Sequence, residues 1–126
     1  MKITILTVGK IKEKYFTDAI KEYTKRLSRY CKLEIIEVAD EKTPDNASEH
    51  EEDLIRQKEG ERLQKYIKEG AYVISLAIEG KQYPSEDFSR KIHNLGLHGE
   101  SHLIFVIGGS IGLDKKILQN SNELLS

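Results

Sequence analysis

Three glycines cluster in residues 108–112, which read Gly-Gly-Ser-Ile-Gly and directly follow an apolar run. Glycines at the end of a strand let the backbone approach a ligand and expose N–H groups to it. The dinucleotide-binding fingerprint needs glycines at the first, third and sixth positions, which this spacing lacks, and no Gly-Lys-Ser/Thr follows as in a P-loop. Gly108, Gly109 and Gly112 therefore indicate either a ligand-binding loop or a tight strand-to-helix turn.

A second candidate site ends another apolar run, at Leu76-Ala77-Ile78-Glu79-Gly80. An apolar strand end beside a glycine turn is able to hold a flat ring while backbone groups bond to the ring edge. Glu79 is a candidate to bind a ribose hydroxyl or a cation. The alternative interpretations are a buried strand that leaves the core and a solvated acid at a turn.

Other reactive side chains form no recognisable catalytic pattern. The histidines, His50, His93, His98 and His102, lack a metal-ligand spacing such as His-Glu-x-x-His, so no metal site is expected. Cys31 has no adjacent base, and we interpret it as a small packing residue between a helix and a strand. No Ser-His-Asp arrangement can be argued, and the sequence leaves the catalytic residue unknown.

Positive charge is concentrated near the amino terminus. Residues 1–32 carry nine Lys/Arg against three Asp/Glu, whereas residues 33–61 carry three against eleven, within a net charge of −1. Much of this charge falls on one side of a predicted helix, where it either binds phosphates or forms the solvated face of an amphipathic helix. The cations are Lys10, Lys12, Lys14, Lys21, Lys25, Arg26 and Arg29.

The elements that would position these residues alternate between strands and helices. Ser48 and Glu51 form the pattern of a capping box at the start of one helix, and Asp114 is the expected N-cap of another. Alternating elements predict an α/β fold, a parallel sheet with helices on both faces. The strands are expected over Lys2–Val8, Leu33–Ala39, Ala71–Ile78 and His102–Ile107, and the helices over 12–30, 49–69, 85–97 and after Asp114.

Size and composition limit the class of protein. The 126 residues, 38% hydrophobic and 33% charged, are expected to form a single folded domain over residues 1–126. One cysteine excludes an intramolecular disulfide and agrees with a reducing cytoplasm. The apolar stretch over 103–113 is too short for a membrane span, and residues 1–10 lack the features of a signal peptide. We therefore expect a cytoplasmic protein with no membrane partner.

Several of these segments closely resemble the RlmH family along the whole chain. Members of this family are SPOUT-class methyltransferases that modify N3 of a pseudouridine in 23S ribosomal RNA. The resemblance is strongest in the opening block and the glycine loop. The matching segments are Lys2–Ile5, Val8–Tyr15, Glu22–Leu27, Ile35–Val38, Asp40–Lys42, Lys58–Gly60, Phe105–Ser110 and Gly112-Leu113.

The resemblance implies S-adenosylmethionine as methyl donor, 23S ribosomal RNA within the ribosome as partner, and a homodimer. It also implies an α/β-knot fold whose C-terminal part is a trefoil knot. By motif position, Leu76 and Gly108 correspond to cofactor-binding residues of the family, and Gly109 and Gly112 belong to the same loop.

Family members continue beyond the position of Ser126 with a further cofactor loop, the knotted helix and a tail that ends in a Tyr-His pair. We therefore expect the knot portion to be missing from this chain, and the family's catalytic residues to lie in that portion. A different class of function stays open: a catalytically inactive α/β fragment that serves only as a dimerisation or RNA-docking domain.

Overall fold

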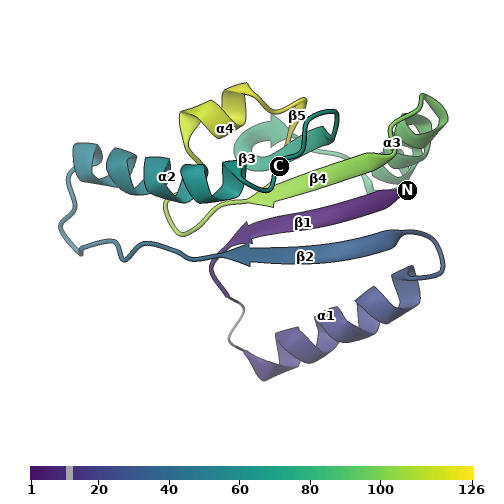
Figure 1. The fold of residues 1–126 in the computed structure, drawn as a ribbon, viewed down its shortest axis with the longest axis horizontal. Helices are drawn as coiled ribbons and strands as arrows, with labels where there is room; N and C mark the ends of the chain where they lie inside the picture. The colour runs from purple at the N-terminus through teal and green to yellow at the C-terminus, as the bar shows by residue number, and fades with distance from the viewer. Residues whose placement is uncertain (11–12) are drawn as a thin grey trace.

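A computed structural model describes residues 1–10 and 13–126. Within them, parallel strands form one sheet in the order β2-β1-β4-β3-β5 (Figure 1). The strands are β1 (Lys2–Val8), β2 (Lys32–Val38), β3 (Tyr72–Lys81), β4 (His102–Ile107) and β5 (Glu123–Leu125). The helices are α1 (Lys14–Leu27), α2 (Glu49–Gln64), α3 (Ser85–Leu97) and α4 (Lys115–Gln119). The predicted α/β class and parallel sheet are confirmed.

The parallel pairing brings the carboxyl ends of β1, β2 and β4 to the same end of the sheet. Val8 of β1 pairs with Val38 of β2, and Thr7 pairs with Ile107 of β4. Since all three strands are parallel, the segments that follow them leave the sheet side by side. The loop that starts at Gly108 and the segment after Val38 therefore lie on the two sides of the end of β1, although about 70 residues separate them in the chain.

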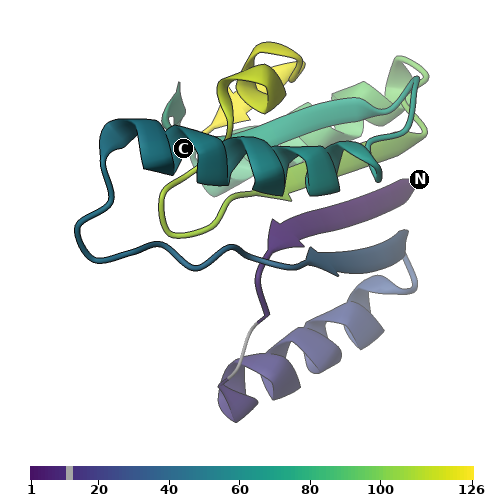
Figure 2. The same cartoon turned by 60° about the vertical axis from the view of Figure 1, so that its left-hand side comes forward.

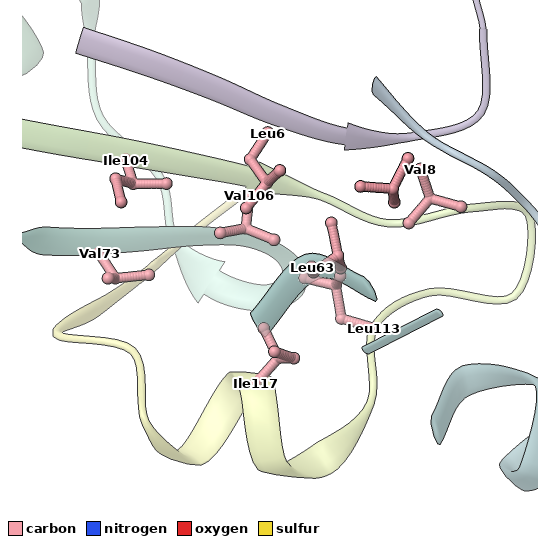
Figure 3. Close-up of a cluster of buried hydrophobic side chains, with 9 residues drawn as sticks. Leu6, Val8, Leu63, Val73, Ile104, Val106, Leu113 and Ile117 are labelled. Carbon is pink, nitrogen blue, oxygen red and sulfur yellow. The ribbon is translucent and has the colours of Figure 1, made fainter. Parts of the chain in front are cut away.

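The main hydrophobic core lies between the sheet and two helices. Leu6, Ile104 and Val106 of the central strands are fully buried. They pack against Leu63 of α2 and Ile117 of α4 on the same face of the sheet (Figure 3). Leu63 and Ile117 are only 1% and 3% exposed, so these two helices are anchored above the carboxyl half of the sheet.

Helices also flank the other side of the sheet, as the sequence predicts. Phe88 of α3 contacts Phe105 of β4, with 6.1 Å between ring centroids. Helix α1 runs along β2, the outer strand, on the side away from α2 (Figure 2). None of its described residues is buried, and Tyr15 and Tyr23 are more than half exposed. The amphipathic pattern predicted this helix correctly, but its apolar stripe is not packed into the core.

Other differences concern the ends of elements. Strand β3 continues to Lys81 through a register shift after Leu76, rather than ending at Ile78, and only Val73–Ser75 are buried. The apolar run over Ala71–Ile78 is therefore buried only in part, because β3 runs past its last partner on β4, Val106. Helices α1 and α2 are shorter than predicted, and strand β5 was not predicted.

Both predicted helix starts are confirmed. Ser48 and Glu51 form the complete capping box of α2. Asp114 occupies the N-cap position of α4 but makes no side-chain capping bond. Among the described residues, no helix is long and apolar enough to cross a membrane.

Candidate functional site

The ends of β3 and β4 border a cleft of about 680 Å³. Strand β3 and the glycine loop after β4 supply two of its walls, and α2 and α4 supply charged side chains. The carboxyl ends of parallel strands are where open α/β sheets bind ligands. The lining residues used below are Asp53, Arg56, Leu76, Ile78, Glu79, Gly108, Gly109, Ile111, Gly112, Leu113 and Lys115.

The glycine loop is a tight turn as well as a wall of the cleft. The Gly112 N–H donates to the Gly109 carbonyl oxygen at 3.1 Å, and Gly112 has a φ of +86°, which favours glycine. A Cβ at Gly108 would lie 2.8 Å from the Gly112 carbonyl carbon. Glycine at 108 is therefore required for the loop to close. The two interpretations left open by the sequence are compatible, since this turn faces a cleft.

The opposite wall of the cleft is the exposed end of β3. Leu76 is 38% exposed and Ile78 is 95% exposed, which is unusual for large apolar side chains on a strand. Across the cleft, the glycine loop ends at the buried Leu113. The geometry thus provides apolar surface beside the backbone groups of a glycine turn, as a flat heteroaromatic ligand requires.

Charged side chains of α2 reach the rim of the cleft. Arg56 donates one hydrogen bond to Asp53 at 2.5 Å and another to the Ile111 carbonyl oxygen at 3.1 Å. The hydrogen bond from Arg56 and the charges of Arg56, Lys115 and His50 outweigh desolvation and hold the pKa of Asp53 below its usual value. Sequence reasoning missed Asp53 and Arg56, because α2 is charged on all sides. No apolar stripe therefore indicates which side of the helix faces the loop.

One further α2 side chain is buried beneath the glycine loop. Glu59 is only 4% exposed, and its Oε2 accepts the Glu41 backbone N–H at 3.0 Å. Its Oε1 has no hydrogen-bond partner among the described residues. A Cβ on Gly109 would lie 3.4 Å from this oxygen, so the carboxylate packs directly against the loop backbone.

The predicted cofactor-binding residues meet in this one cleft. Leu76, Gly108, Gly109 and Gly112 all line it, together with Glu79. They come from strands whose ends are about 30 residues apart in the chain. Their role in binding stays a prediction, but the structure brings all of them to a common surface.

The other candidate residues lie elsewhere. His102 is the first residue of β4, so it lies at the end of the sheet opposite the cleft. Its Nε2 lies 2.8 Å from the Thr4 hydroxyl. Cys31 is half-buried between α1 and β2, as expected of a packing residue. Lys12 falls outside the described residues. Within the described part of the chain, no group of three or more His, Cys, Asp or Glu side chains is arranged to hold a metal ion.

Residues 1–126 match the family described as "Predicted SPOUT methyltransferase". The chain belongs to the SPOUT methyltransferase family. The glycine loop and the apolar end of β3 are therefore features of a SPOUT methyltransferase.

Three relatives of this SPOUT chain carry the name "Ribosomal RNA large subunit methyltransferase H". The protein of Bifidobacterium adolescentis is 62% identical over 126 residues, and those of Clostridium tetani and Clostridium kluyveri are 60% and 55% identical over 125. The alignments cover 99–100% of this chain and 79% of each relative. The resemblance to the RlmH family stated from the sequence is confirmed.

Proposed function

We propose that this SPOUT methyltransferase transfers a methyl group from S-adenosylmethionine to N3 of a pseudouridine in 23S ribosomal RNA. The names of its relatives support ribosomal RNA of the large subunit as the substrate. The observation that carries the proposal is the meeting of Leu76 with the Gly108–Gly112 loop in one cleft at the carboxyl ends of β3 and β4. By resemblance to the RlmH family, we further propose a cytoplasmic homodimer that acts on the ribosome.

The cleft fits the chemical groups of the methyl donor. Leu76, Ile78 and Leu113 offer apolar surface to an adenine ring, and the loop backbone offers polar groups to the ring edge. Asp53 and Glu79 are carboxylates suited to ribose hydroxyls or to an ammonium group. When bound, S-adenosylmethionine supplies an activated methyl group on a sulfonium centre.

The residues of this chain then have to orient the substrate and assist loss of the N3 proton. Alignment of the two reacting groups supplies much of the rate enhancement in such transfers. The carboxylates of the cleft are Asp53 and Glu79. Asp53 is a poor base, because its ion pair with Arg56 stabilises the charged form. We assign the protein a role in binding and positioning and leave the general base unassigned.

The RNA would be docked by the basic side of α1. Lys14, Lys21, Lys25 and Arg26 of the helix are all exposed, as are Lys10 before it and Arg29 after it. Arg26 is paired with Glu22 on the helix surface. Phosphate groups of RNA are attracted to such clusters of cations, largely without regard to sequence.

A methyl-transfer assay tests the proposal. The protein expressed from its gene is incubated with S-adenosylmethionine labelled in the methyl group and with ribosomes from a strain deleted for that gene. We expect label in 23S RNA, and mass spectrometry of the digested nucleosides should find it on N3 of a pseudouridine. Label on another nucleoside would overturn the proposed target, and no transfer to the ribosome would overturn the activity.

The donor site is tested by a matched pair of substitutions. Leu76→Ala removes apolar surface from the cleft, whereas Leu97→Ala removes an exposed side chain of α3 that does not line it. Loss of this contact should weaken S-adenosylmethionine binding about fivefold in Leu76→Ala, as measured by calorimetry. Leu97→Ala should bind like the parent. Equal affinities in all three proteins would show that Leu76 is not in the donor site.

A further inference from the structure

Helix α2 carries charged side chains of alternating sign at every third position. They are Asp53, Arg56, Glu59 and Arg62. Three of them reach the loops at the carboxyl edge of the sheet. Arg62 donates to the Ala39 carbonyl oxygen at 2.9 Å and to Glu41 at 2.8 Å, so it holds the segment after β2.

Arg56 holds the glycine loop in the same manner. Its guanidinium donates to the Ile111 carbonyl oxygen at 3.1 Å and is fixed from the other side by Asp53. The Arg56 side chain is only 22% exposed, which protects this charge-assisted hydrogen bond from solvent. The bond joins residues 55 positions apart in the chain and ends inside the loop, at Ile111.

Glu59 contacts the loop at a second point. Its buried carboxylate lies against Gly109, while its Oε2 is tied to the Glu41 N–H. The same helix therefore contacts the loop at Gly109 and at Ile111. The loop's own bond, from the Gly112 N–H to the Gly109 carbonyl oxygen, closes the segment that includes both contacts.

We propose that Arg56 is a positioning residue for methyl transfer: through the Ile111 carbonyl it fixes the Gly108–Gly112 loop in the conformation that binds the methyl donor. The inference rests on the proposed function for the identity of the donor. Arg56 acts through the loop backbone, because its Nη1 donates directly to the Ile111 carbonyl oxygen while its Nη2 is held by Asp53. A loop that is held before binding does not have to be ordered by the ligand, and this raises affinity.

The experiment compares Arg56→Gln with Arg62→Gln in the protein expressed from its gene. Both arginines lie on α2, and each bonds one backbone carbonyl and one carboxylate, so a merely structural role predicts similar effects. The first readout is deuterium uptake, which needs no ligand. We expect faster exchange over residues 109–113 in Arg56→Gln, and over residues 39–42 in Arg62→Gln.

The second readout is the affinity for S-adenosylmethionine. We expect the Kd to rise about tenfold in Arg56→Gln, as for the loss of one charge-assisted hydrogen bond, and to stay at the parent value in Arg62→Gln. Arg56→Lys should restore only part of the affinity, because a lysine lacks the planar fork that spans both acceptors.

Different results would overturn the inference and the proposed function. If uptake over residues 109–113 is unchanged in Arg56→Gln, or if Arg62→Gln weakens binding equally, Arg56 is not the positioning residue. If the parent itself does not bind S-adenosylmethionine, the proposed donor is wrong, and deuterium uptake alone decides whether Arg56 fixes the loop.

Discussion

At the scale of single residues, the side chain of Glu123 joins β5 to the rest of the molecule. Its carboxylate accepts hydrogen bonds from Tyr72 at 3.2 Å and from Tyr83, and it pairs with Lys91 of α3 at 2.8 Å. Burial by itself would raise the pKa of Glu123. The hydrogen bonds from Lys91 and Tyr83 and the charge of Lys91 outweigh burial, and the pKa lies below its usual value of 4.5.

This shift predicts how stability depends on pH. Because the pKa is lower in the folded protein than in the unfolded chain, the stabilisation is complete above about pH 5 and is lost as the pH falls through the folded value. Glu123→Gln should lower the free energy of unfolding by about 1–3 kcal/mol at pH 7. Urea titrations from pH 3 to 7 should show this difference shrinking below pH 4.5. A difference that is constant with pH would contradict the assignment.

At the scale of elements, α2 is held by little apolar surface. It is charged along most of its length, and Leu63 is its one large apolar side chain in the buried core cluster of the described residues. The capping box at Ser48 secures the first turn, and Arg56, Glu59 and Arg62 bind the loops. The helix is thus positioned by ionic contacts and anchored by a single leucine.

A pair of truncations separates these contributions. Leu63→Ala removes a side chain that is 1% exposed, and it should lower the free energy of unfolding by about 3 kcal/mol. Leu54→Ala, on the same helix but 44% exposed, should lower it by less than about 1 kcal/mol. Chemical denaturation of both variants measures the difference. Equal effects would show that the ionic contacts, rather than Leu63, anchor the helix.

At the scale of the whole molecule, charge is separated although its sum is close to zero. The net charge of −1 provides no long-range attraction to RNA, so docking should depend on a local patch. Helix α1, whose cations are exposed, lies beside the outer strand β2 and away from α2 and α4 (Figure 1). This separation makes it feasible to remove the patch without touching the cleft.

The patch is tested by changing Lys21, Lys25 and Arg29 together to Gln. Each lost phosphate contact should weaken ribosome binding and lower the slope of log affinity against log salt by about one unit. The control changes the exposed Lys65, Lys68 and Lys116 to Gln, which alters the net charge equally. Binding titrations at several salt concentrations compare the two. If both triple variants behave alike, α1 is not the RNA-docking surface.

The sequence by itself determined the elements whose signals are local. Alternating apolar runs and periodic segments predicted β1–β4 and the parallel sheet, and the Ser48–Glu51 pair predicted the start of α2. The glycines at 108–112 also indicated the loop, because a turn of this kind requires glycine whatever surrounds it. Leu76 and the three loop glycines were placed at strand ends, and parallel strands bring such ends to the same edge.

What the tertiary structure decided are contacts between residues that are distant in the chain. Strand β5 is too short to show the alternating apolar pattern of a strand. It forms because it pairs with the free edge of β3 and because Glu123 bonds to Lys91 and two tyrosines. The exposed apolar side of α1 follows from its place beside an outer strand. Arg56 and Glu59 looked like two more charges on a charged helix. Their position over the glycine loop is set by the packing of α2 on the sheet through Leu63. No local sequence pattern predicts this packing.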